Sequence, residues 1–149
     1  MPQNTAPIYP LTPYAVVLQG PSNIWTACVT RAPTATASLA AANIIEFVPT
    51  SSFGRRIDKI QVQGSSSGIS APTAAMSLLI FLWDGTTAFF FDEIVVTVQT
   101  PGTGAAAFQA SKSYTNLVLP AAFKLYAACT VTTASATTAI TVAAFGGDY

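Results

Sequence analysis

The residue types that usually carry catalysis are scarce in this chain of 149 residues. It contains no histidine, which removes the commonest general base and the commonest metal ligand. Asp92 and Glu93 are adjacent, so in a strand they face opposite ways and cannot act as a catalytic pair. The Gly-Thr-Gly sequence at 102–104 lacks the strand-to-helix context of a nucleotide-binding loop. The sequence therefore predicts a protein that is not an enzyme, with no catalytic residue, metal site or cofactor.

Two groups of residues remain as candidates for contact with a partner. Residues 55–59 form the densest charge cluster, which suits an interface ion-pair site or, as the favoured interpretation, a solvated strand start. In the triple phenylalanine at 89–91, a strand would turn Phe90 to one side and its two neighbours to the other. This arrangement suits a ligand platform or, as the favoured interpretation, core on one side and a subunit contact on the other. The candidate contacts from these two groups are Arg55, Arg56, Phe89 and Phe91.

Charge is sparse throughout the chain. Only 8% of residues are charged, against about 25% in an average soluble protein. Six basic residues balance six acidic ones, which leaves no basic field for nucleic acid or an anionic membrane. A freely diffusing monomer normally carries more charge for solubility. The composition therefore predicts a chain that is covered by copies of itself or by other partners.

The two cysteines, Cys28 and Cys129, have no nearby histidine and no Cys-x-x-Cys spacing. One disulfide is an alternative, but two buried, reduced thiols are favoured because the first residues lack the features of a secretory signal. The uncharged stretch 125–147 is long enough to raise the question of a membrane helix. Its threonine, serine and glycine content argues against one.

Short apolar runs separated by turn residues predict an all-β chain. Two local features stand out: Asp84–Gly85 is a favoured hairpin turn, and the spacing of Ile57 and Ile60 predicts a bulge near Asp58–Lys59. About eight strands without a convincing helix predict a single-domain β-sandwich of jelly-roll type. The expected strands are 24–30, 43–49, 55–63, 75–83 (covered on both faces), 86–97 and 114–119, then a final hairpin of 123–132 with 137–145 and a glycine-loosened tail. A loop is expected at 99–113 and a short helical turn at 38–42.

Residues 1–23 contain five prolines and predict an extended N-terminal arm, with the β-sandwich domain at 24–149. Each proline fixes φ and removes a hydrogen-bond donor, so poor ladder pairing is expected. Apolar side chains in the arm favour docking over a free tail, and a neighbouring subunit is favoured over the arm's own domain. The candidate contacts in the arm are Ile8, Tyr9, Leu11 and Tyr14.

Four segments between Gly54 and Tyr149 together resemble a family of small structural proteins of tailed bacteriophages. They are GRRIDKIQVQ from Gly54, LLIFLWDGT from Leu78, LVLPAAFKLYAACT from Leu117 and the terminal TVAAFGGDY. Phe123 stands where the family usually has Gly-Tyr or Tyr, so the loop there is expected to be altered. The resemblance implies a jelly-roll fold like that of capsid decoration or cement proteins, and it carries over no catalytic residues.

The resemblance implies a virion component, and we expect a capsid decoration protein that is made in the host cytoplasm and located on the capsid surface. The expected partners are the major capsid protein and copies of the chain itself, with a trimer favoured and part of Thr86–Thr97 at the contact. Neither nucleic acid nor a membrane is expected as a partner. The alternatives are a tail or head–tail connector subunit and a carbohydrate-binding jelly-roll module, for which Trp25 and Trp83 are the only tryptophans.

Overall fold

The structure is a computed structural model, and it describes residues 9–10, 14–19, 28, 31, 34–35, 44–66, 75–99, 107–130 and 138–149. These ranges contain ten strands and no helix. The described residues therefore include no helix long and apolar enough to span a membrane. The strands are β1 (Tyr9–Pro10), β2 (Tyr14–Gln19), β3 (Thr34–Ala35), β4 (Ile45–Val48), β5 (Arg55–Ser66), β6 (Met76–Trp83), β7 (Thr87–Val96), β8 (Gln109–Leu119), β9 (Lys124–Cys129) and β10 (Thr138–Asp148).

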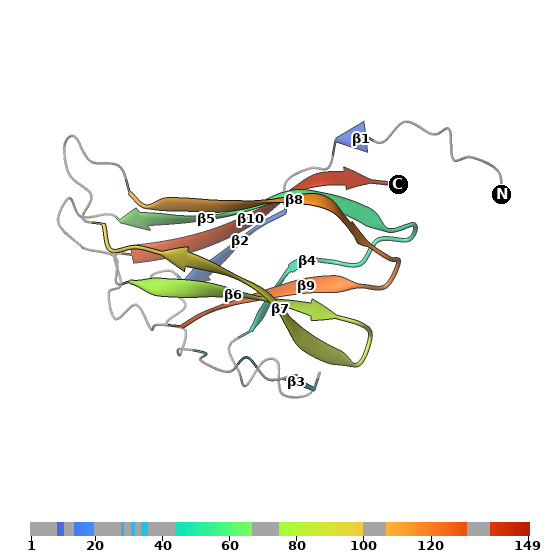
Figure 1. The fold of residues 1–149 in the computed structure, drawn as a ribbon, viewed down its shortest axis with the longest axis horizontal. Coiled ribbons are helices and arrows are strands. Elements are labelled where there is room, and N and C mark those ends of the chain that lie inside the picture. Colours follow the sequence, from blue (N-terminus) through green and yellow to red (C-terminus); the bar gives the residue numbers. More distant parts are fainter. Residues whose placement is uncertain are drawn as a thin grey trace.

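The strands form two antiparallel sheets packed face to face. Sheet I has the order β2–β10–β5–β8, and β1 lies beside the end of β10. Sheet II has the order β3–β7–β6–β9–β4. In Figure 1, sheet I lies above sheet II.

The strand pairs are nested along the chain. β6 pairs with β7, β5 with β8, β4 with β9, and β2 with β10, so each pair encloses the one before it. Successive pairs fall alternately in sheet II and sheet I. This is a long hairpin rolled over on itself, which is the jelly-roll arrangement. The predicted fold class, an all-β sandwich of jelly-roll type, is confirmed.

The main core lies between the two sheets. Alternate residues of the central strands point inward and are buried, and the bulge of β5 adds one extra residue to this period-two pattern. Burying one such aliphatic side chain contributes about 1.5–3 kcal/mol before entropy is counted. The inward residues include Ile57, Ile60 and Val62 of β5, Leu78 and Ile80 of β6, and Ile140, Val142 and Ala144 of β10.

A second, smaller core covers the outer face of sheet II. Leu79 and Phe81 alternate with the inward residues of β6, yet both are 0% exposed. Cys28 packs in this cluster, and its backbone N–H donates to the carbonyl of Cys129 at the end of β9. The prediction that this strand is covered on both faces is confirmed.

Two local predictions are confirmed by hydrogen bonds and register. At the β6–β7 turn, Asp84 Oδ1 accepts the backbone N–H groups of Thr86 and Thr87, both at 2.9 Å, and Gly85 has a φ of 113°. A positive φ of this kind favours glycine. The register between β5 and β8 shifts between Ile57 and Lys59, which is the expected bulge.

The predicted final hairpin is wrong. β9 pairs with β4 and β6 in sheet II, whereas β10 pairs with β2 and β5 in sheet I. The expected glycine-loosened tail is also wrong, because Gly146 and Gly147 continue β10 and pair with Ile57 and Arg56. Closeness in the sequence favoured a hairpin, but each strand has a better partner far away in the chain.

The expectation that prolines prevent ladder pairing throughout residues 1–23 is wrong for Tyr9–Pro10, which pairs with the end of β10, and for Tyr14–Gln19. The latter stretch lies between Pro13 and Pro21, contains no proline itself, and forms β2 against β10. It belongs to the sheet rather than to an arm outside it. The expected loop at 99–113 is wrong at its end, because β8 begins at Gln109. Most of the expected strand 24–30 and all of the expected turn at 38–42 lie outside the described residues.

Candidate functional site

Three of the four segments that carry the phage resemblance meet at one end of sheet I, around Gly54 and Arg55. Arg55, the first residue of β5, lies in register with Leu119 of β8 on one side and with Asp148 of β10 on the other. The N–H of Tyr149 donates to the carbonyl of Gly54 at 3.3 Å. We call this region the Gly54 corner.

An ion pair between a buried arginine and a partly exposed aspartate closes the Gly54 corner. The Arg55 side chain is 3% exposed, and its Nε lies 3.2 Å from Oδ1 of Asp148. Its Nη2 also donates to the carbonyl oxygen of Thr50, at 3.2 Å. A buried guanidinium is tolerated only when anions and acceptors surround it. Arg55 therefore ties the β4–β5 turn to the end of β10.

Two glycines allow the backbones of the corner to approach closely. A Cβ at Gly146 would lie 1.8 Å from the carbonyl oxygen of Arg56. Gly54 has a φ of 94°, and a Cβ there would lie 2.8 Å from the carbonyl oxygen of Leu119. Any side chain at either position would force the strands apart. The glycines of the two motifs are thus explained by contacts within this chain.

The surface of the Gly54 corner combines apolar groups with one paired charge. Phe53 is 80% exposed, Val118 is 48% exposed and Tyr149 is 38% exposed. Arg56 Nε lies 2.8 Å from Oδ1 of Asp58, and both side chains are partly exposed. Exposed apolar side chains grouped in this way are typical of contact surfaces.

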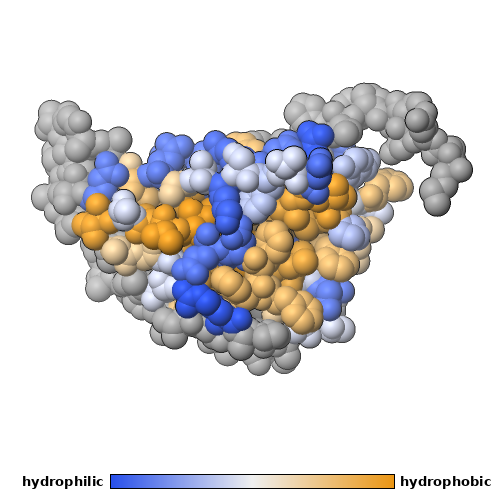
Figure 2. All heavy atoms as spheres, viewed as in Figure 1, coloured by the Kyte–Doolittle hydropathy of each residue, from blue (hydrophilic) through white to orange (hydrophobic). Residues whose placement is uncertain are grey.

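A second candidate contact lies where β7 and β8 adjoin, at one open edge of the sandwich. Phe89 and Phe91 are exposed there, and the Phe91 ring stacks on Tyr114 of β8 with centroids 6.1 Å apart. Phe90 faces the other way and packs edge-on against Phe81 in the outer cluster. The predicted sidedness of the three rings is therefore confirmed. Figure 2 shows one side of the molecule, with hydrophobic areas on either side of a hydrophilic band.

Asp92 joins the two sheets at this edge. Its carboxylate accepts hydrogen bonds from Lys112 Nζ and from the Tyr114 hydroxyl of β8, the latter at 2.8 Å. Burial alone would raise the pKa of Asp92, but these hydrogen bonds outweigh it and hold the pKa below its ordinary value. Burial and the Asp92 carboxylate raise the pKa of Tyr114.

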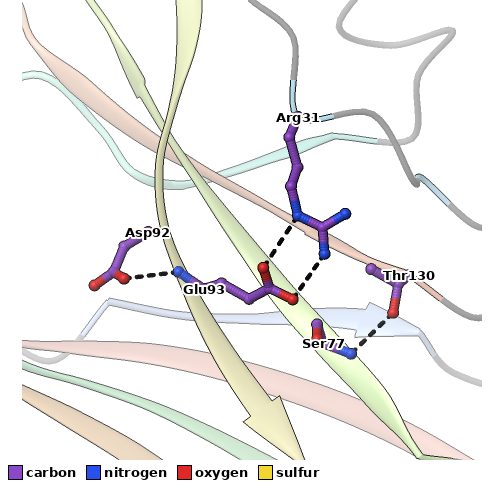
Figure 3. A network of polar contacts seen from close by, with 5 residues as sticks. All are labelled: Arg31, Ser77, Asp92, Glu93 and Thr130. Atoms are coloured by element: carbon purple, nitrogen blue, oxygen red, sulfur yellow. Dashed lines mark hydrogen bonds and ion pairs between the residues drawn. The ribbon is translucent and has the colours of Figure 1, made fainter.

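Glu93 points away from Asp92, as Figure 3 shows. It forms a two-pronged ion pair with Arg31, whose Nη2 and Nε lie 2.8 and 3.1 Å from its carboxylate oxygens. The hydrogen bond from Arg31 lowers the pKa of Glu93. The Arg31 guanidinium also lies 5.9 Å from the Phe90 ring centroid. The two acids therefore face opposite sides of β7, as the sequence predicts.

Both cysteines are free and buried, which agrees with the favoured prediction. They lie in different clusters: Cys129 in the core between the sheets and Cys28 in the cluster outside sheet II. Burial raises the pKa of the Cys129 thiol to about 12. Among the described residues, no three His, Cys, Asp or Glu side chains are grouped in a way that could hold a metal ion.

The predicted contact residues fall in several places. Arg55 and Arg56 meet at the Gly54 corner, but burial of Arg55 leaves almost none of its side chain to a partner. Phe89 and Phe91 lie at the β7–β8 edge. Tyr9 lies in β1 and Tyr14 in β2, while Ile8 and Leu11 are outside the described residues.

Sequence reasoning missed Asp148, Tyr114 and Phe53. The one available signal was that the cationic start of β5 and the acid near the chain end both belong to the resembling motifs. No protein-family model and no curated protein sequence matches this chain. Its function is therefore argued from its own residues.

Proposed function

We propose that this chain is a structural protein of a tailed-bacteriophage virion, and that it decorates the capsid as a cement protein. The observation that carries the proposal is the Gly54 corner. The resembling motifs GRR, LPA and GGDY are far apart in the chain, yet the contacts of Gly54 with Tyr149 and of Arg55 with Asp148 join them. Because a jelly roll serves many functions, the fold supports the proposal without specifying it.

The mechanism is burial of apolar surface across seams between capsid subunits. A protein that binds only the assembled shell stabilises it by mass action. Phe53, the most exposed aromatic ring among the described side chains, and the pair Phe89 and Phe91 supply apolar surface at two separate places. The Gly54 corner would face the major capsid protein, and the β7–β8 edge would face a second copy, with a trimer favoured. Neither role requires catalysis, a cofactor, nucleic acid or a membrane.

The test uses phage particles assembled without this protein. Purified protein is added, and bound copies per particle and the temperature of shell disruption are measured. We expect saturable binding to capsids and a higher disruption temperature. Binding to isolated tails or connectors, but not to capsids, would replace the proposal by the tail or head–tail connector alternative.

One single and one double variant separate the two proposed contacts. Phe53→Ser should weaken capsid binding, whereas Phe89→Ser with Phe91→Ser should weaken self-association measured by light scattering. Val98→Ser is the matched control, because Val98 is 60% exposed and lies beyond the end of β7. If all of these variants bind capsids and self-associate as the parent does, the proposed contacts are wrong.

A further inference from the structure

The outer face of sheet I carries three cross-strand rows of side chains, each taken from the three neighbouring strands β10, β5 and β8. Registers between these strands place the members of each row directly beside one another. We call this surface the amide face. Its rows are Thr141, Gln63 and Gln109; Ala143, Gln61 and Ser111; and Phe145, Lys59 and Ser113.

The amide face points away from the core. Ile60 and Val62 of β5 are 0% exposed, so the alternating residues Gln61 and Gln63 lie on the other side of the sheet. The third strand contributes three side chains that are all exposed. The inward side chains are packed in the main core, so the outward ones stand on a rigid support.

The chemistry of the amide face is unusual for a solvated sheet. Eight of its nine residues are uncharged, and the ammonium of the ninth, Lys59, lies 5.1 Å from the ring centroid of Phe145. A freely solvated surface normally has about 25–35% charged residues of both signs. The amide face carries no acid to attract a cation or a basic protein, and its single cation is a weak attraction for a polyanion.

Amides and hydroxyls suit one class of ligand in particular. A glutamine side chain offers two donors and one acceptor oxygen, and a serine or threonine hydroxyl both donates and accepts. Neighbouring strands lie about 4.8 Å apart and successive rows about 6.7 Å apart, so the groups form a regular grid. Adjacent hydroxyls on sugar rings present matching donors and acceptors without charge.

We propose that the amide face binds a neutral polysaccharide. Gln61, Gln63 and Gln109 would exchange hydrogen bonds with its hydroxyls. The inference goes beyond capsid decoration and does not depend on it, because binding is a property of the isolated chain. Nothing in it involves the Gly54 corner or the β7–β8 edge.

The test is native electrophoresis of the full chain in gels containing dextran, galactomannan or yeast mannan, with alginate as an acidic polymer. We expect retardation in at least one neutral gel and none in alginate. Loss of two amide hydrogen bonds in Gln61→Ala with Gln63→Ala should weaken that binding about tenfold. Thr97→Ala is the control, because Thr97 is exposed beyond the end of β7, and it should bind as the parent does.

A second variant guards against loss of fold. Gln63→Met with Gln109→Met removes the donors and acceptors of two neighbouring side chains of the amide face while keeping their length, so binding should fall without any change in the core. Both double variants are checked by their thermal unfolding midpoints. The proposal is overturned by absence of retardation in every neutral gel, by retardation in alginate alone, by unchanged binding in folded double variants, or by a change of oligomeric state that identifies the face as a self-contact.

Discussion

The guanidinium of Arg55 lies 3.2 Å from the carboxylate of Asp148, and it is almost completely buried. This pair joins the first residue of β5 to the last residue of β10 and so fixes the register of two long strands. Asp148 is 40% exposed, so the buried member is Arg55, and removal of Asp148 would leave a buried cation without its anion. The Gly54 corner therefore depends on both residues.

Arg55→Ala should lower the free energy of unfolding by about 3 kcal/mol, because it removes a large buried side chain together with its hydrogen bond to the Thr50 carbonyl. Arg56→Ala is the matched control, since its ion pair with Asp58 is partly exposed and its loss should change the stability far less. Urea denaturation followed by tryptophan fluorescence measures both. Equal losses of the free energy of unfolding in the two variants would show that the buried Arg55 side chain stabilises the protein no more than the partly exposed Arg56 does.

Gly146→Ala should be the most disruptive glycine substitution at the corner. The added Cβ would lie 1.8 Å from the carbonyl oxygen of Arg56, so the backbones of β5 and β10 would have to separate. A Cβ added at Gly85 would meet no atom within 4 Å, so Gly85→Ala should lose only the energy of backbone strain at a positive φ, about 1 kcal/mol. Comparison of the two unfolding midpoints tests this, and a Gly146→Ala variant as stable as Gly85→Ala would contradict it.

Local patterns predicted the local features of this fold well. The Asp84–Gly85 turn, the bulge at Asp58 and the opposite facing of Phe90 and its neighbours all follow from a few adjacent residues. The pairing partners of the strands could not be predicted from adjacent residues, because nothing near β9 or β10 indicates that these two strands belong to different sheets. For the same reason Arg55 looked like a solvated residue: its carboxylate partner is brought close only by the register of distant strands.

Acid should destabilise the protein through the carboxylates of β7. The pKa values of Asp92 and Glu93 are lowered below their ordinary values of 3.8 and 4.5. A carboxyl whose folded pKa is depressed contributes stability that is present above its unfolded pKa and is lost as the pH falls through the folded pKa. Unfolding midpoints should therefore be nearly constant from pH 6 to 7 and decline below about pH 4.5.

Tyr114→Phe isolates the Asp92 part of this effect. The variant keeps the ring that stacks on Phe91 but loses the hydroxyl that donates to Asp92. The variant should lose about 1–2 kcal/mol of the free energy of unfolding at pH 7. Its unfolding midpoint should fall less steeply in acid, because the pKa of Asp92 moves back toward its ordinary value. Identical pH profiles for the variant and the parent would contradict the link between Tyr114 and Asp92.

The cysteines should be unreactive in the folded protein. Both are buried, and a Cys129 pKa of about 12 leaves almost no thiolate at pH 8. A colourimetric thiol reagent should therefore find no reactive thiol in the native state and two after denaturation without reductant. Finding none after denaturation would mean that Cys28 and Cys129 are paired.

The length of an N-terminal deletion should decide its effect. Removing residues 1–8 leaves every described strand in place, so the unfolding midpoint should be unchanged while particle binding weakens, if this segment attaches to a neighbour. Removing residues 1–20 also deletes β2 and exposes the edge of β10, so it should lower the midpoint. Equal midpoints after both deletions would show that β2 adds no stability to the sheet.

The central claim, that this chain decorates a capsid, is tested most directly by a cryo-EM map of the phage particle that carries it. We predict a jelly-roll density on the outer surface of the capsid, seated across subunit seams, with the Gly54 corner toward the shell and the β7–β8 edges of neighbouring copies in contact. A map in which the capsid surface lacks this density, or in which the jelly roll lies only in the tail or the connector, would contradict it.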